Sequence, residues 1–313
     1  MKYNSYIKDA VKVSEIGFGA WQLGQNSGWK SMSEKEAIQL VEKAIDYGVN
    51  FFDTAPNYGH GSGEERLGKA LKTTDRSKIV INTKFGHTQT GTTNYEASYI
   101  RESLEGSLKR LQVDYVDSLI IHNPPSSYLD GYKNDHYELL ETLIEEGKIK
   151  AYGASVDTYE DMKLLISTTH AKVIEAFFNI LHQDTARGFD LAKEKDVAII
   201  AKIPLDSGWL SGKYNKNSNF KGIRSRWSKK DIETRAQLIE RIKAITGEDT
   251  HLAQKALSFC LSYDAVSTVI PGNANCNQLK TNVESVNYPL SKNTIAKLEQ
   301  LYHTEVKPLN LPW

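Results

Sequence analysis

The segment Lys78–His122, KIVINTKFGHTQTGTTNYEASYIRESLEGSLKRLQVDYVDSLIIH, decides the fold of this 313-residue chain. It begins with a short, largely apolar run that ends at Lys84, and it closes with a second such run over Tyr115–His122. Between the two runs, apolar residues recur at helical spacing from Ile100 to Leu111. This order predicts a buried strand, an amphipathic helix and a second buried strand.

The same alternation extends through the rest of the chain in both directions. Strands are expected to start near residues 16, 49, 78, 115, 150, 173, 197 and 265. Helices are expected over residues 35–47, 64–71, 100–111, 136–146, 159–167, 187–195, 232–246, 252–263 and 277–286, with an extra helix over 291–302. Eight strands, each followed by a helix, predict an α/β fold of the (β/α)8 TIM-barrel type. A doubly wound sheet shows the same alternation and is the alternative.

The chain is expected to form a single domain over residues 1–313, because no proline-rich or low-complexity linker divides it. The longer interval before the last strand indicates an insertion at about 205–230, and an extra helix and tail follow at about 290–313. In a barrel of this type, the cofactor and the active site lie at the C-terminal ends of the strands.

The composition favours a soluble protein with a small-molecule partner. Basic and acidic residues number 39 each, and this balance argues against nucleic acid as the main partner. With 40% hydrophobic and 25% charged residues, the chain has an ordinary globular composition. Cys260 and Cys276 fit neither a zinc site nor a disulfide framework, so no metal is expected. We find no signal peptide and no apolar stretch long enough to cross a membrane, and we expect a cytoplasmic location.

Two glycine-containing segments imitate nucleotide-binding loops. Gly17–Gln22 begins like a dinucleotide fingerprint, but its sixth residue is Gln22, and no helix is expected to open there. Gly63–Lys69 nearly matches a Walker A loop, but the next residue is Ala70, which has no hydroxyl for magnesium, and the stretch is expected to lie inside a helix. Any nucleotide is therefore expected to bind in another way.

Polar residues stand where several of the expected strands end. Asp53, Lys84, His122, Ser155 and Asn179 end successive strands, and Tyr58 follows Asp53 in the sequence DTAPNYG. Each residue alone could be a helix cap or a solvated side chain. Asp53, Lys84 and His122, however, all stand at the ends of neighbouring strands. This shared position predicts that they belong to one site.

These residue types together suit carbonyl reduction. A tyrosine is a weak acid, with an ordinary pKa of about 10. An adjacent lysine ammonium lowers that pKa, and Asp53 can supply the partner that a buried ammonium needs. A histidine in the same cavity can donate a hydrogen bond to a substrate oxygen. The set would protonate the oxygen while a hydride arrives at carbon.

A longer ordered series of motifs contains these residues and resembles the aldo-keto reductase superfamily. The series runs from about Gly17 to Asn282 and covers most of the chain. It comprises Asp53–Gly59 with GEERLG at 63–68, TKFG at 83–86, SLKRL at 107–111 with DYVD at 114–117, His122, GKI at 147–149, GAS at 153–155, PL at 204–205, GWLSGK at 208–213, and IPG at 270–272 with Gln278 and Asn282.

The resemblance implies a barrel that binds NADP(H) in extended form without a Rossmann domain, with NAD(H) as the second choice. It implies a reversible NAD(P)H-dependent oxidoreductase, an NADP-dependent aldo-keto reductase that reduces aldehydes, ketones or sugar-type substrates. Tyr58 would be the general acid, Lys84 and Asp53 would tune it, and His122 would orient the carbonyl. The residues implied in cofactor binding are Gly19, Trp21, Asp53, Ser155, Glu175, Lys202, Pro204, Leu205, Ser207, Gly208, Leu210, Lys213, Gly272, Gln278 and Asn282.

Two residues depart from the family pattern. Glu175 stands where many members have a glutamine that touches the nicotinamide carboxamide, and Lys202 stands where many stack a tyrosine under the ring. A pairing of Lys202 with Glu175 is one hypothesis. Arg224 and Arg226 are candidates for a 2′-phosphate, and Lys280 is the only base near the adenosine end.

Aromatic residues are expected to ring the mouth of the barrel. Candidates are Trp21, Trp29, Trp209 and Trp227 together with Tyr58, and an aromatic wall favours apolar or planar carbonyl substrates. Trp21, Trp29, Tyr58 and His122 are the expected substrate contacts, and Trp313 or Leu311 is expected near the site. Two other functions stay open: a Schiff-base lyase that uses Lys84, and a regulatory protein that holds cofactor with little turnover.

Overall fold

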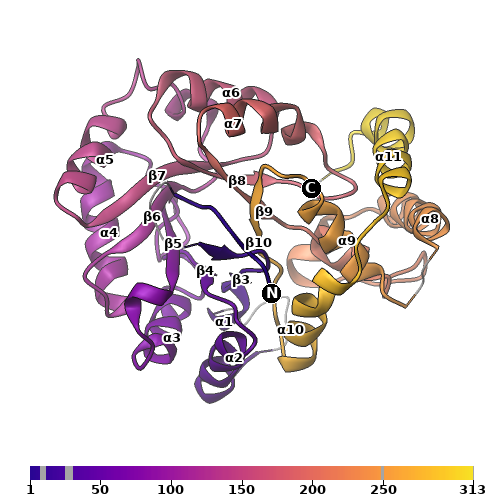
Figure 1. Ribbon diagram of the computed structural model, residues 1–313, viewed down its shortest axis with the longest axis horizontal. Coiled ribbons are helices and arrows are strands. Elements are labelled where there is room, and N and C mark those ends of the chain that lie inside the picture. The colour runs from indigo at the N-terminus through magenta and orange to yellow at the C-terminus, as the bar shows by residue number, and fades with distance from the viewer. Residues whose placement is uncertain (8–11, 25–30, 248–249, 313) are drawn as a thin grey trace.

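The computed structural model, which describes residues 1–7, 12–24, 31–247 and 250–312, contains a central barrel of eight parallel strands surrounded by helices (Figure 1). The strands are β3 (Phe18–Gly19), β4 (Phe51–Asp53), β5 (Val80–Phe85), β6 (Val116–Ile121), β7 (Ile149–Val156), β8 (Val173–Phe177), β9 (Ala198–Lys202) and β10 (Val266–Val269). Each strand pairs with the next in sequence order. Parallel bridges Ile16–Val269 and Gly19–Gly272 join the first strand to the last. The closed order confirms the predicted (β/α)8 barrel and rules out a doubly wound sheet, whose strand order reverses.

Helices follow the strands as the periodicity predicts. They are α2 (Glu34–Asp46), α3 (Ser62–Leu71), α4 (Ala97–Leu111), α5 (His136–Glu145), α6 (Tyr159–Thr168), α7 (Phe189–Glu194), α8 (Lys229–Thr246), α9 (Leu252–Leu261), α10 (Cys276–Val283) and α11 (Lys292–Leu301). The Walker-like stretch lies inside α3, as expected. The prediction that no helix opens after β3 is wrong, because α1 (Trp21–Gly24) forms there. It has only one turn, which is too short to produce a periodic signal.

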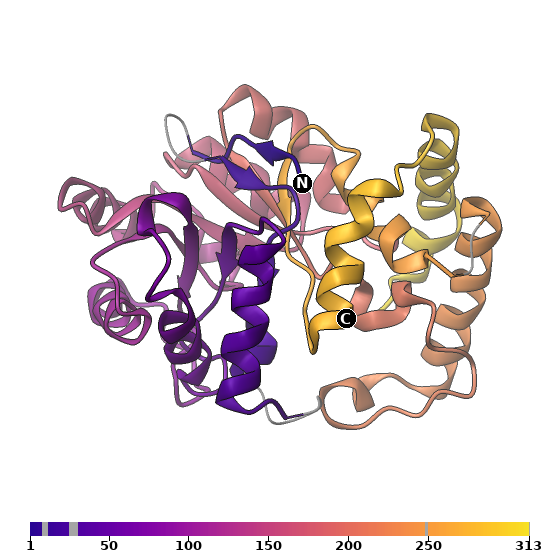
Figure 2. The ribbon, with the colours of Figure 1, turned by 60° about the horizontal axis from the view of Figure 1, so that its bottom comes forward.

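An N-terminal hairpin that the sequence analysis missed lies at one end of the barrel (Figure 2). Its strands β1 (Tyr3–Asn4) and β2 (Val13–Ser14) are too short to show alternation. Tyr6 follows β1 and is buried, with its ring 5.1 Å from that of Phe51 and its hydroxyl 2.6 Å from Ser118 Oγ. The hairpin thus lies at the N-terminal end of the strands and leaves the C-terminal end for a site.

The barrel interior changes from apolar to polar along β5. Because successive strand residues point to opposite faces, Val80, Asn82 and Lys84 share the inward face. Val80 belongs to a buried apolar cluster at the hairpin end. Asn82 donates to Asp53 at 2.7 Å, and Lys84 donates to the same carboxylate one step further along. The strand therefore places an apolar side chain at one end of the barrel interior and hydrogen-bonded polar side chains at the other.

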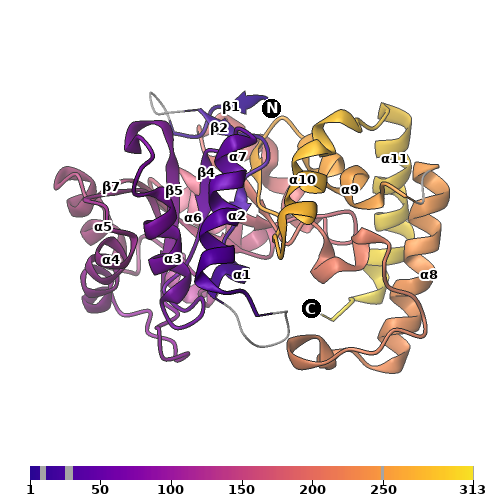
Figure 3. The same cartoon turned by 90° about the horizontal axis from the view of Figure 1, so that it is seen from below.

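The segment between β9 and α8 lies at the opposite end of the barrel from the hairpin (Figures 2 and 3). It contains two short 3-10 segments, Asp206–Ser211 and Gly222–Arg226, and occupies the position of the predicted insertion. Within the described ranges, no helix combines the length and the hydropathy needed to cross a membrane.

Candidate active site

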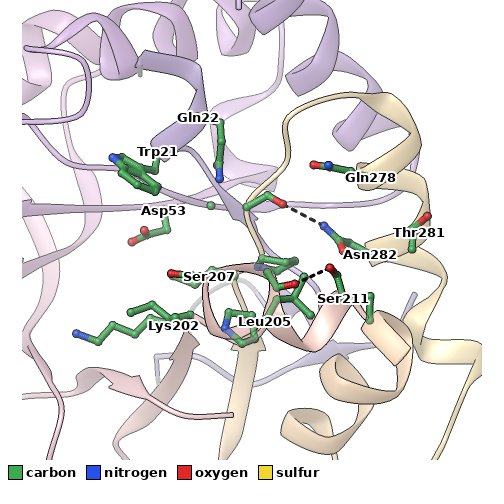
Figure 4. A pocket seen from close by; sticks show the side chains of 18 of the residues that line it. Trp21, Gln22, Asp53, Lys202, Leu205, Ser207, Ser211, Gln278, Thr281 and Asn282 are labelled. Atoms are coloured by element: carbon green, nitrogen blue, oxygen red, sulfur yellow. Dashed lines mark hydrogen bonds between the residues drawn. The ribbon is translucent and has the colours of Figure 1, made fainter. Parts of the chain in front are cut away.

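A cavity of about 1040 Å³ opens at the C-terminal ends of the strands. In Figure 4, Trp21 and Asp53 lie at one end of it, and Gln278 and Asn282 from α10 lie at the other. Ser207, in the segment after β9, lies between these ends. The cavity is therefore elongated and joins the first strand of the barrel to the helix that follows the last.

The structure brings the four predicted catalytic residues together at one end of this cavity. Asp53, Tyr58 and His122 line it, and Lys84 is fully buried directly behind Asp53. The Lys84 ammonium lies 5.3 Å from the centre of the Tyr58 ring. The ring of His122 stands edge-on to that of Tyr58, with 6.0 Å between the centroids. Asn179, another strand-end candidate, caps its own turn by accepting from the N–H groups of two following residues.

Lys84 is held by three oxygen-bearing neighbours. Its ammonium donates to both oxygens of Asp53, at 2.6 and 2.8 Å, and to the carbonyl oxygen of Thr54 at 3.0 Å. The carboxylate of Glu175, on β8, lies 3.1 Å away. Burial lowers the pKa of Lys84, but Asp53 and Glu175 raise it above its ordinary value. Lys84 is therefore a charged ammonium across the neutral pH range.

The two carboxylates around this single ammonium repel each other. Burial and the charge of Glu175 raise the pKa of Asp53 to about 7, against the opposing effect of Lys84. The cluster of Asp53, Glu175 and Lys84 therefore takes up one proton near neutral pH.

We expect Glu175→Gln to weaken the pH dependence of stability. The folded pKa of Asp53 is about 7, and its unfolded value is about 3.9. Between these two pH values, Asp53 is protonated in the folded state and ionised in the unfolded state. The free energy of unfolding therefore falls as the pH rises from about 4 to about 7, by up to about 1.4 kcal/mol per pH unit. Removing the Glu175 charge lowers the folded pKa of Asp53 and so reduces this slope. Urea unfolding midpoints between pH 5 and 8 measure it.

The control for this experiment is Glu160→Gln, which alters an exposed glutamate paired with Arg187. It should leave the slope of the wild type unchanged. An equal slope in Glu175→Gln and in the wild type would show that Glu175 does not set the protonation of Asp53.

Tyr58 differs from the expectation in the direction of its pKa. Burial raises the pKa of Tyr58 above its ordinary value, and Lys84 acts in the predicted opposite direction but does not outweigh burial. The expected net lowering is therefore wrong for this structure. A raised pKa keeps the phenol protonated at neutral pH, which is the form that can donate a proton.

His122 is a neutral imidazole in this environment. Burial and the positive charges of Lys84 and Lys202 lower its pKa well below the ordinary value. Its Nδ1 atom is buried and has no hydrogen-bond partner among the described residues. His87 stacks on its ring, with centroids 4.4 Å apart.

Most of the residues implied in cofactor binding line the cavity. They are Gly19, Trp21, Asp53, Glu175, Lys202, Pro204, Leu205, Ser207, Gly208, Lys213, Gly272, Gln278 and Asn282. Ser155 and Leu210 lie behind its wall: both are buried, and neither lines the cavity. Arg226 lines it, whereas Arg224 is buried and donates to the carbonyl oxygen of Ser207 at 3.0 Å. Lys280 does not line the cavity and pairs with Glu284 at 3.7 Å.

The hypothesis that Lys202 pairs with Glu175 is wrong. The Lys202 ammonium instead pairs with Asp157 at 2.8 Å. It also donates to Ser155 Oγ at 2.7 Å and to Asn123 Oδ1 at 2.5 Å. Glu175 pairs with Lys84, because both side chains point into the barrel. Two cations that could have shared one carboxylate thus have separate partners.

The segment after β9 has an unusual backbone that a buried ion pair secures. Asp206 and Ser207 have φ values of 44° and 53°, in the left-handed region that costs most residues energy. The Asp206 carboxylate is fully buried and pairs with the equally buried Arg235 at 3.3 Å. Arg235 also donates to the carbonyl oxygen of Pro312, so α8 and the C-terminal segment together support this loop.

The cavity has the donors and the close approaches that a dinucleotide needs. Lys213 and Arg226 bring positive charge to its wall, and Gln278 and Asn282 lie on α10, whose N-terminal end suits an anion. The side-chain amide of Gln22 lies close over Gly272, so a Cβ atom there would require that amide to move. The Oε1 atom of Gln22 is itself buried without a partner among the described residues. These features fit a nicotinamide dinucleotide.

The expected aromatic wall is largely absent from the described part of the cavity. Trp209 and Trp227 are buried and pack against each other, with centroids 5.9 Å apart, so their predicted place at the mouth is wrong. Both side chains belong to the main hydrophobic core, which the insertion joins through them. Trp21 does line the cavity. Leu311 packs against the main core and does not line the cavity. Trp29 and Trp313 lie outside the described residues.

Several cavity residues were missed by the sequence analysis. Asn57, His87 and Asn123 line the end that holds Tyr58, and Gln22 lines the middle. His87 and Asn123 lie two residues past the ends of β5 and β6, so a search for polar residues just beyond the strand ends could have found both. Asn57 adjoins Tyr58 in the same loop.

Comparisons with known proteins agree with this geometry. A family model described as the aldo/keto reductase family matches residues 15–303. The chain is 27% identical to an L-galactose dehydrogenase of Arabidopsis thaliana, over 97% of this chain and 94% of that one. It is 29% identical to a probable voltage-gated potassium channel subunit beta of the same plant, with 98% of each chain covered. Among solved structures, the holo form of an aldo-keto reductase from Bacillus halodurans matches with a TM-score of 0.79 and 26% identity, over 96% of each chain.

Proposed function

Because the chain belongs to the aldo/keto reductase family, we propose that it is an NAD(P)H-dependent oxidoreductase that reversibly reduces aldehydes or ketones to alcohols. One observation carries this proposal. A phenol, a buried ammonium–carboxylate pair and a neutral imidazole meet at one end of a cavity whose other end suits a dinucleotide.

In the proposed reaction, a reduced nicotinamide supplies the hydride when bound. Tyr58 donates its phenolic proton to the substrate oxygen as negative charge develops there. The ammonium of Lys84 stabilises the phenolate that remains, and Asp53 and Glu175 keep Lys84 charged. His122 donates a hydrogen bond to the same oxygen from Nε2, since a proton on Nδ1 would be buried without an acceptor.

We propose NADP(H) as the preferred cofactor and NAD(H) as the alternative. Lys213 and Arg226 are cavity-lining cations that could hold a 2′-phosphate. Lys280, the base expected near the adenosine end, is occupied with Glu284 at the surface. Affinities of the protein for NADPH and NADH, measured by fluorescence titration, decide between the two cofactors.

The Schiff-base alternative is not favoured by the environment of Lys84. A nucleophilic lysine needs the free amine, but the neighbouring carboxylates raise the pKa of Lys84. A cofactor-holding protein with little turnover is the second candidate, because the relatives include potassium channel beta subunits. The presence of Tyr58, Lys84, Asp53 and His122 together in one site favours the enzyme.

The proposal is tested with a panel of aldehydes and ketones, by following the absorbance of NADPH and NADH. Consumption of cofactor together with formation of the alcohol would support it. Tight cofactor binding with negligible turnover across the whole panel would favour the regulatory candidate. Borohydride trapping of a carbonyl compound on Lys84, without any nicotinamide present, would favour the lyase.

A further inference from the structure

The wall of the cavity near Tyr58 is polar. Asn57, His87, His122 and Asn123 line it there, and the two tryptophans expected nearby are packed elsewhere. The Oδ1 atom of Asn57 is buried and has no hydrogen-bond partner among the described residues. A simple apolar carbonyl compound would leave the Asn57 oxygen unpaired, at a cost of about 1–3 kcal/mol if it is fully desolvated. The polar wall therefore suits a substrate with hydroxyl groups near its carbonyl.

His87 lies within reach of such a hydroxyl. It follows β5 in the chain, and His122 follows β6, the paired neighbour of β5. The two imidazole rings stack with their centroids 4.4 Å apart, and the His122 ring lies 6.0 Å from that of Tyr58. A substrate whose carbonyl oxygen meets Tyr58 and His122 would place the next carbon atoms of its chain beside His87.

The hydrogen bonds of His87 assign the roles of its two ring nitrogens. Its Nε2 atom lies 2.9 Å from the hydroxyl of Tyr95. That hydroxyl has one proton, which it donates to the carbonyl oxygens of His122 and Asn123 at 2.9 and 3.1 Å. Carbonyl oxygens cannot donate, so His87 must donate its Nε2–H to Tyr95. The Nδ1 atom is then an acceptor, and the hydrogen bond of the ring to Tyr95 leaves it available.

The charge state of His87 agrees with this assignment. Burial and the charge of Lys202 lower the pKa of His87. The ring is therefore neutral near pH 7 and keeps one nitrogen as a hydrogen-bond acceptor.

We infer that His87 is a specificity-determining residue whose Nδ1 atom accepts a hydrogen bond from a substrate hydroxyl, and that the substrates are hydroxyaldehydes or hydroxyketones. The inference rests on the proposed reductase function. His87 accepts from the substrate, Tyr95 fixes the tautomer that can do so, and Tyr58 and His122 bind the carbonyl oxygen. The partner group on the substrate is a hydroxyl one or two carbons from the carbonyl.

The test compares glyceraldehyde with propanal, which has the same carbon chain without the hydroxyls. The measured quantity is the ratio of kcat/KM for glyceraldehyde to kcat/KM for propanal, so that any general loss of activity cancels. We expect the wild type to favour glyceraldehyde and His87→Phe to lower the ratio about tenfold, the effect of losing one hydrogen bond. Phenylalanine keeps a ring stacked on His122. A second readout is the ratio of the dissociation constants of glycerol and 1-propanol, measured by calorimetry.

Two further variants separate this role from a structural one. His303→Phe makes the same change on an exposed histidine that does not line the cavity, and it should leave the ratio unchanged. Tyr95→Phe removes the acceptor that fixes the tautomer, and it should lower the ratio by a smaller factor; it also serves if His87→Phe does not fold. An equal ratio in the wild type, His87→Phe and Tyr95→Phe would overturn the inference. If the wild type reduces neither aldehyde, the proposed function itself fails.

Discussion

Tyr58→Phe is expected to lower kcat for carbonyl reduction by about 10²–10⁴-fold, the usual contribution of a positioned general acid. The substitution removes only the hydroxyl. The ring still packs beside His122, and the buried Lys84–Asp53 pair is untouched. We therefore expect the dissociation constants of NADPH and NADH, measured by fluorescence titration, to stay close to those of the wild type.

The matched control is Tyr137→Phe. Tyr137 is also buried, but its hydroxyl donates to the carbonyl oxygen of Tyr128 and it does not line the cavity. This variant should keep its kcat. Wild-type turnover in Tyr58→Phe would mean that another group protonates the substrate, and equal losses in both variants would point to a general loss of structure.

Lys84→Met is expected to have the second large effect, on stability as well as on rate. The substitution leaves Asp53 and Glu175 buried side by side without their cation. Breaking a buried pair in this way costs about 3–5 kcal/mol. It also removes the charge that opposes the raised pKa of Tyr58, so the pH profile of kcat should move as the rate falls. Urea unfolding and pH–rate profiles measure these two effects.

Two further variants separate charge from packing in this cluster. Asp53→Asn in the Lys84→Met background removes one uncompensated charge, so it should recover part of the lost stability without restoring activity. Lys150→Met makes the same substitution at a lysine whose carboxylate partner, Asp117, keeps Arg76 at 2.8 Å. It should cost far less. A loss below about 1 kcal/mol for Lys84→Met would contradict the account of a buried ion cluster.

The sequence predicted the barrel and the meeting of Asp53, Lys84 and His122 because both follow from local patterns. Eight apolar runs alternate with amphipathic helices, and the carboxyl ends of parallel strands meet at one end of the barrel. Asp53, Lys84 and His122 end three consecutive strands. Because the carboxyl ends of these strands meet, the three residues could be assigned to one site without any measured distance.

The rest depended on contacts that no local pattern encodes. Glu175 meets Lys84 across the barrel interior, far along the chain, and the side-chain directions of both residues decide that contact. The net direction of the Tyr58 pKa depends on how completely the folded chain buries the phenol. Trp209 and Trp227 resemble mouth residues in sequence, but in the folded chain they pack against each other within the main hydrophobic core.

The most direct test of the central claim is the rate of single turnovers in water and in deuterium oxide, for the wild type and for Tyr58→Phe at saturating cofactor. If Tyr58 gives its proton to the substrate oxygen, the wild type should turn over more slowly in deuterium oxide. Tyr58→Phe should be slow in both solvents, with the difference between them lost. Equal single-turnover rates and equal solvent effects in the two proteins would contradict the account.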